Sequence, residues 1–121
     1  MIINNKKIDF LFTVGAEADM RKLCECGNIE QISELLQNPL TAIDTCAAVA
    51  VILNKWAVKY QEREGAVTSA SLLVDDVFLM RPYEIQELMA EVMRAMQEGY
   101  ETGIELETQK NGESRVKPAE Q

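Results

Sequence analysis

Residues 2–16 read IINNKKIDFLFTVGA, and this opening stretch constrains the fold more than any other part of the chain. Two short runs of strand-forming residues flank Asn4-Asn5, and asparagine tolerates the left-handed backbone conformation that tight hairpin turns require. In the second run, alternate residues from Ile8 to Phe12 fall on one strand face, and the run stops at a glycine that leads into a helical pattern. We therefore expect an N-terminal β-hairpin, residues 2–14, before a helical body.

Helical segments follow, in which apolar residues recur at three- and four-residue spacing. The longest runs from Thr41 or Ile43 to Glu62 without glycine or proline and is apolar on more than one side, so we expect it to be the central helix. The others are predicted at residues 16–26, 29–37, 71–80 and 82–100. The predicted fold class is mainly α, with about five helices in a compact bundle and a small N-terminal β-hairpin.

Capping residues and prolines indicate where these helices begin and end. Gly27 is placed to end the first helix, and Asn28, with Gln31 three residues later, to begin the second. Pro39 ends the second helix because the residue before a proline avoids the helical conformation. Pro82 suits the first turn of the last helix.

The fourth predicted helix and the end of the chain carry further expectations. Ser71 is the expected N-cap of the fourth helix. Its apolar residues Leu72, Leu73, Val77 and Phe78 are expected to pack, and its acidic residues Asp75 and Asp76 to stay outside. The last helix is expected to end at Gly99 or Gly103, after which Ile104 and Leu106 suit a short strand. Residues 1–105 are predicted to form a single domain, and residues 106–121 a polar, mobile C-terminal tail.

The chain is acidic, with a formal net charge of −8. This charge argues against nucleic acid and anionic membranes as partners, because both present phosphates. It permits a basic partner and is also a common route to solubility. The longest apolar run, Cys46 to Leu53, is far shorter than the ~20 residues that span a bilayer, and the first residues lack the layout of a signal peptide. We expect a cytoplasmic protein.

No arrangement of residues indicates catalysis, a metal or a cofactor. Cys24, Cys26 and Cys46 occur in a chain without histidine, whereas zinc usually takes four nitrogen or sulfur ligands and cysteine nucleophiles commonly use a histidine base. Neither GxGxxG nor GxxxxGK[ST] occurs. We expect reduced, structural thiols, no metal site, no cofactor and no enzymatic activity.

The last predicted helix carries the candidate residues for protein binding. Met89, Val92, Met93, Met96 and Tyr100 lie on or beside its apolar stripe, and methionine-rich surfaces adapt to varied partners. The same residues would also suit an imperfectly packed core. Both interpretations stay open from the residues alone.

The segment Lys7–Ala16 resembles the start of tail assembly chaperones from long-tailed bacteriophages and prophages, in which a hairpin with an aromatic-rich second strand runs into a glycine-initiated helix. Segments Leu72–Val77 and Pro82–Tyr100 resemble the C-terminal half of that family, so that the resemblance covers residues 2–105. It implies a protein of the bacterial host cytoplasm that binds the long, helical tape-measure protein. The partner would stay soluble while tail-tube subunits polymerise around it.

Other functions stay open at this stage. One is a small structural virion protein, such as a head–tail connector or completion factor. Another is an acidic regulatory module that binds a bacterial protein. It also stays open whether the tail-tube protein is a second partner and whether the chain forms a homo-oligomer. The same holds for a longer product made by ribosomal frameshifting.

Overall fold

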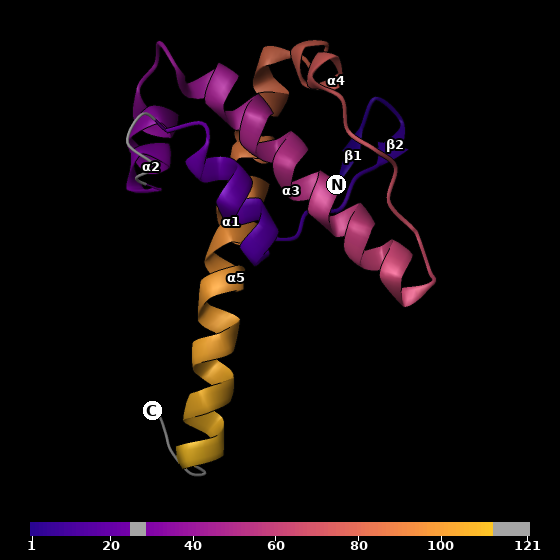
Figure 1. Cartoon of the computed structure of the whole chain (residues 1–121). Coiled ribbons are helices and arrows are strands. Elements are labelled where there is room, and N and C mark those ends of the chain that lie inside the picture. Colours follow the sequence, from indigo (N-terminus) through magenta and orange to yellow (C-terminus); the bar gives the residue numbers. More distant parts are fainter. Residues whose placement is uncertain (25–28, 113–121) are drawn as a thin grey trace.

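The structure is a computed structural model that describes residues 1–24 and 29–112, with side chains described as far as Tyr100. Within these ranges the chain forms one short hairpin and a set of helices arranged around a long central helix (Figure 1). In chain order the elements are β1 (Ile2–Ile3), β2 (Lys6–Lys7), α1 (Val14–Arg21), α2 (Glu30–Gln37), α3 (Ala42–Glu64), α4 (Val74–Phe78), the 3₁₀ turn η1 (Pro82–Glu84) and α5 (Ile85–Gly112). The predicted fold class is confirmed.

The hairpin confirms the predicted turn but not the predicted second strand. Asn4 and Asn5 have φ angles of 50° and 65°, and this two-residue turn sets the antiparallel register in which Ile2 lies opposite Lys7. The second strand is Lys6–Lys7, so the strand expected at residues 8–13 is wrong. Because β1 is only two residues long, the register leaves no strand partner for residues 8–13.

Helices α1 and α2 begin close to the predicted positions. Thr13 caps α1, since its side-chain oxygen accepts the Ala16 N–H at 3.1 Å. The helix ends at Arg21, earlier than the expected residue 26, and α2 begins at Glu30. The caps expected at Gly27 and Asn28 lie outside the described residues.

Helix α3 is the central element, as its sequence predicts. It contacts α1, α2, α4 and α5. Its buried side chains are mostly small, which lets neighbouring elements approach closely; they are Cys46, Ala47, Val49, Ala50, Leu53, Asn54 and Ala57. The helix ends at Gly65, whose φ of 81° is readily adopted by glycine.

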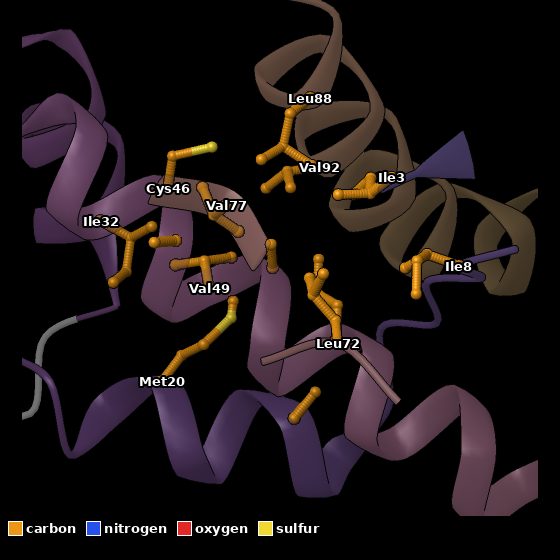
Figure 2. Close-up of a cluster of buried hydrophobic side chains, with 14 of the residues drawn as sticks. Ile3, Ile8, Met20, Ile32, Cys46, Val49, Leu72, Val77, Leu88 and Val92 are labelled. Atoms are coloured by element: carbon orange, nitrogen blue, oxygen red, sulfur yellow. The ribbon is translucent and has the colours of Figure 1, made fainter. Parts of the chain in front are cut away.

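The hydrophobic core collects side chains from every part of the described chain (Figure 2). Each contributing element places at least one nearly fully buried residue there, none more than 3% exposed: Ile3 and Ile8 from the N-terminal segment, Met20 from α1, Ile32 from α2, Leu72 and Val77 from the α4 region, and Leu88 and Val92 from α5. The hairpin is therefore part of the core.

One buried polar side chain, Asn54 of α3, joins two other segments to the central helix. It is 2% exposed. Its Nδ2 donates to the carbonyl oxygens of Asp9 at 3.0 Å and Ala70 at 3.1 Å, and contacts Ser69 Oγ at 3.1 Å. Its Oδ1 accepts the Leu72 N–H at 2.7 Å. Main-chain groups before α1 and before α4 are thus satisfied by one α3 side chain.

Helix α4 is shorter than predicted, which changes the face it turns to the core. Leu73, not Ser71, is its N-cap residue and has an extended conformation. Leu72 and Val77 are buried as expected. However, Leu73 is 62% and Phe78 51% exposed, so their predicted packing is wrong. The helix starts at Val74, so Leu73 is extended instead of helical. The side chains therefore point in other directions than in a helix that starts at Ser71.

Asp76 was expected in solvent but is buried against the hairpin. Its Oδ2 lies 2.6 Å from Lys6 Nζ and accepts the Leu73 N–H at 2.9 Å. Asn4 Nδ2 donates to the Asp76 carbonyl at 3.1 Å. These contacts lower the pKa of Asp76, first through the Lys6 hydrogen bond and then through the Leu73 N–H. The hairpin turn and α4 are therefore tied together by charge and hydrogen bonds.

Helix α5 follows Pro82, which occupies the first turn of η1 as predicted, and runs on to Gly112 (Figure 1). The end expected at Gly99 or Gly103 is wrong, and the residues expected as a short strand around Ile104 are helical. Gly99 lies where Phe12 crosses the helix: a Cβ there would be 2.7 Å from Phe12 Cδ2, so close approach requires the glycine. Residues 106–112 of the expected tail are helical, and residues 113–121 lie outside the described residues.

Replacing Asn54 by alanine is expected to lower the free energy of unfolding by about 2–4 kcal/mol, because the Leu72 N–H and two carbonyls lose a buried partner. Urea unfolding followed by circular dichroism measures this loss. Glu62→Ala, an exposed change on the same helix, serves as control and is expected to change stability by no more than about 0.5 kcal/mol. A similarly small loss of unfolding free energy for Asn54→Ala would contradict the proposed role of Asn54 in holding the two segments on α3.

Acid is expected to destabilise the fold through three carboxylates whose pKa values lie below the ordinary 3.8: Asp9, Asp19 and Asp76. A lowered native pKa stabilises the fold above the unfolded value, and the contribution disappears as pH falls through the native pKa. Stability is therefore expected to be level down to about pH 5 and to fall below about pH 4. Urea titrations across this range should show a weaker acid dependence for Asp76→Asn. An unchanged dependence in that variant would exclude Asp76 as a contributor.

Candidate functional site

An apolar groove lies between α2 and α5 on the surface of the bundle. Ile29, at the start of α2, and Ile32 and Leu36 within it form one wall. Met93, Met96 and Tyr100 of α5 form the other wall. The groove encloses about 500 Å³, and its polar lining comes from Glu30, Ser33 and Gln97. We call this surface the α2–α5 groove.

Local sequence explains why both walls are apolar. In α2, residues 29, 32 and 36 follow the three- and four-residue spacing of one helix face. In α5, residues 93, 96 and 100 do the same, one step around the helix from the buried pair Leu88 and Val92. Both helices pack on α3. The parts of their apolar faces that α3 does not cover line the groove between them.

The structure divides the five residues predicted to bind a partner. Met93 and Tyr100 are 45% and 48% exposed and line the groove together with the half-buried Met96. Val92 is 0% exposed in the core, which rules out a direct contact with a partner. Met89 is half-buried against the core and does not line the groove.

The α2 wall was not among the predicted binding residues. The sequence predicted a helix at residues 29–37 with apolar residues at three- and four-residue spacing. Only Ile32 is fully buried, whereas Ile29 and Leu36 are partly exposed at the groove. A spacing pattern shows that a helix has an apolar face. Packing against other elements decides which residues of that face are buried and which stay exposed.

Tyr100 is held in place at one end of the groove. Its ring packs edge-on against Phe12, with centroids 5.0 Å apart and ring planes at 63°. Its hydroxyl donates to Glu17 Oε2 at 3.4 Å, and burial followed by the nearby Glu17 charge raises the pKa of Tyr100. Glu17 also pairs with Arg21 at 2.9 Å. This end of the groove is therefore fixed by contacts with the segment before α1 and with α1 itself.

A second set of exposed apolar residues lies on α4 and η1. Phe78 is 51%, Leu79 72% and Tyr83 80% exposed, beside the exposed Leu73. We call these four residues the α4–η1 surface. They follow one another closely in the chain but do not line the α2–α5 groove. Leu73 and Phe78 were expected to pack in the core, and no expectation concerned Leu79 or Tyr83.

The described thiols and acids do not form a reactive or metal-binding arrangement. Cys24 and Cys46 are free and buried, and burial raises the pKa of Cys46 to about 11, so its thiol is protonated at neutral pH. Cys26 lies outside the described residues. Within residues 1–24 and 29–100, no three histidine, cysteine or acidic side chains are grouped to hold a metal ion. In the described helices, no stretch combines the length and apolar character that crossing a bilayer requires.

Two substitutions distinguish the core residue from the groove residue on α5. Val92→Ala leaves a cavity and is expected to lower the free energy of unfolding by about 2 kcal/mol. Met93→Ala removes a side chain that is 45% exposed and is expected to change it by no more than about 0.5 kcal/mol. Urea unfolding of both variants checks the division. Equal losses would place Met93 in the core instead of on the groove wall.

Comparison of this chain with models of protein families, with curated proteins and with solved structures finds no match.

Proposed function

We propose that this chain is a non-enzymatic tail assembly chaperone that holds amphipathic helical segments of a phage tape-measure protein in the α2–α5 groove. The groove is the single observation that carries the proposal. Its two walls are parts of helices, its lining is mainly aliphatic and methionine-bearing, and it is open to the surface. Such a groove suits the apolar face of a partner helix.

The chemistry of the lining favours a tolerant binding mode. Met93 and Met96 have flexible, polarizable side chains that adapt to differently shaped apolar residues. Tyr100, held by Phe12 and Glu17, supplies a rigid aromatic edge at one end. Each partner side chain buried here would contribute roughly 1.5–3 kcal/mol. A chaperone for a long helical protein needs this kind of repeated, imprecise contact.

The charge of the chain supports a solubilising role. A net charge of −8 keeps a complex dispersed after apolar segments of the partner are covered. The resemblance of Lys7–Ala16 and of the last helix to tail assembly chaperones supplies the identity of the partner. The bacterial host cytoplasm, and tail-tube subunits as a second partner, follow from the same resemblance.

The test is co-expression of the full chain with a helical fragment of a tape-measure protein, followed by a solubility assay and a pull-down. The wild-type chain is expected to bring the fragment into the soluble fraction and to co-purify with it. The double variant Met93→Gln/Met96→Gln is expected to bind about tenfold more weakly or worse, because it makes one groove wall polar. Circular dichroism confirms that its helicity is retained.

Leu79→Gln is the matched control, since Leu79 is 72% exposed on the α4–η1 surface and not in the groove. Its binding should equal that of the wild-type chain. Retained binding in the double methionine variant, or loss in Leu79→Gln, would contradict the groove assignment. An insoluble fragment together with ring formation by the chain alone would favour a structural virion protein. Binding only to an unrelated host protein would favour a regulatory module.

A further inference from the structure

A second hollow, beside the first turn of α1, is lined by basic and aromatic side chains. Trp56, Lys59, Tyr60 and Arg63 of α3 form one side. The first residues of α1, with Thr13 before them, form the other side. The hollow encloses about 270 Å³. We call it the basic hollow; it shares no lining residue with the α2–α5 groove.

The two cations of the basic hollow differ from most others in the described chain. Elsewhere, described lysines and arginines are held in ion pairs with nearby acids: Lys6, Lys7, Arg21, Lys22, Lys55 and Arg94. Lys59 and Arg63 form no ion pair with any residue in the ranges 1–24 and 29–100. They stand one helical turn apart on the same face of α3, so both charges face one hollow. In an acidic chain, two such cations together favour an anionic ligand.

The aromatic floor of the hollow is rigid. Trp56 Nε1 donates to Asp19 Oδ2 at 2.8 Å, and Gly15 lies so close above the ring that a Cβ there would be 2.5 Å from ring carbons. Lys59 Nζ lies 5.6 Å from the centre of the same ring, which orients the ammonium group. The ligand would therefore meet a fixed apolar surface beside the charges.

The start of α1 adds to the positive potential. Thr13 caps the helix by accepting the N–H of Ala16. The N–H groups of Val14 and Gly15, in the first turn of α1, have no acceptor within the helix and carry the positive end of its dipole. This contribution reinforces the two side-chain cations at the same hollow.

We propose that the basic hollow binds carboxylate side chains of an acidic segment of a partner protein, with an apolar neighbour of the carboxylate resting on Trp56 and Tyr60. Two cations match one or two carboxylates, and arginine binds a carboxylate through two parallel hydrogen bonds. A nucleic acid strand is disfavoured, because its successive phosphates would also meet the rest of a chain whose net charge is −8.

Trp56 is the only tryptophan of the chain and therefore reports binding at the hollow directly. The probe is a short, end-blocked peptide of alternating glutamate and leucine, titrated into the full chain while tryptophan fluorescence is recorded. A saturable fluorescence change is expected with the glutamate peptide. The same peptide with glutamine in place of glutamate is expected to bind at least about tenfold more weakly. No saturable change, or equal binding of the glutamine peptide, would overturn the proposal. Tighter binding of single-stranded oligodeoxythymidine would replace it with a nucleic-acid site.

Arg63→Gln and Lys59→Gln are each expected to weaken binding of the glutamate peptide by about tenfold. Arg81→Gln removes the same charge from an exposed residue outside the hollow and should bind as the wild-type chain does. An equal loss in Arg81→Gln would overturn the proposal, since the attraction would then be general. Met93→Gln/Met96→Gln should leave peptide binding unchanged, so that failure of the groove and failure of the basic hollow are distinguishable.

Discussion

The arrangement of the molecule depends on the hydrogen bonds of one buried side chain, Asn54. Two segments without regular structure, residues 8–13 and 66–73, cross α3 and bring main-chain groups into the protein interior. Buried main-chain groups need partners, and Asn54 serves Asp9, Ala70 and Leu72 at once. Its contact with Leu72 also holds the chain extended just before α4 begins. Asn54 thus holds both segments against α3, and the Lys6–Asp76 pair joins the hairpin that precedes one segment to the helix that follows the other.

Both candidate binding sites involve contacts with α1 or with the segment just before it. At the α2–α5 groove, Tyr100 rests on Phe12 and reaches Glu17, which fixes one end of the groove. At the basic hollow, Gly15 lies against Trp56, and both residues line the hollow. The glycines at residues 15 and 99 permit these close approaches.

Several features of the fold could be predicted because they depend on neighbouring residues alone. The Asn4-Asn5 turn follows from asparagine's tolerance of positive φ, and Pro82 in a first helical turn from its fixed φ. Other features depend on distant residues and were predicted wrongly. Asp76 was expected to face solvent, but it pairs with Lys6 of the hairpin, which is distant in the sequence. Gly99 looked like a helix end, although Phe12 is what requires a glycine there.

For the sites, the sequence indicated an apolar stripe on the last helix but not whether the stripe forms a surface or part of the core. Spacing alone predicted the helical class and the long central helix, and it gave five candidate binding residues on the last helix: Met89, Val92, Met93, Met96 and Tyr100. Only the tertiary structure decided that Val92 is internal and that Ile29 and Leu36 supply the opposite wall. It also decided that Lys59 and Arg63 face one hollow, where no acid among the described residues pairs with them. The reason is physical: local periodicity fixes which residues share a helix face, whereas burial and charge pairing depend on which other elements cover that face.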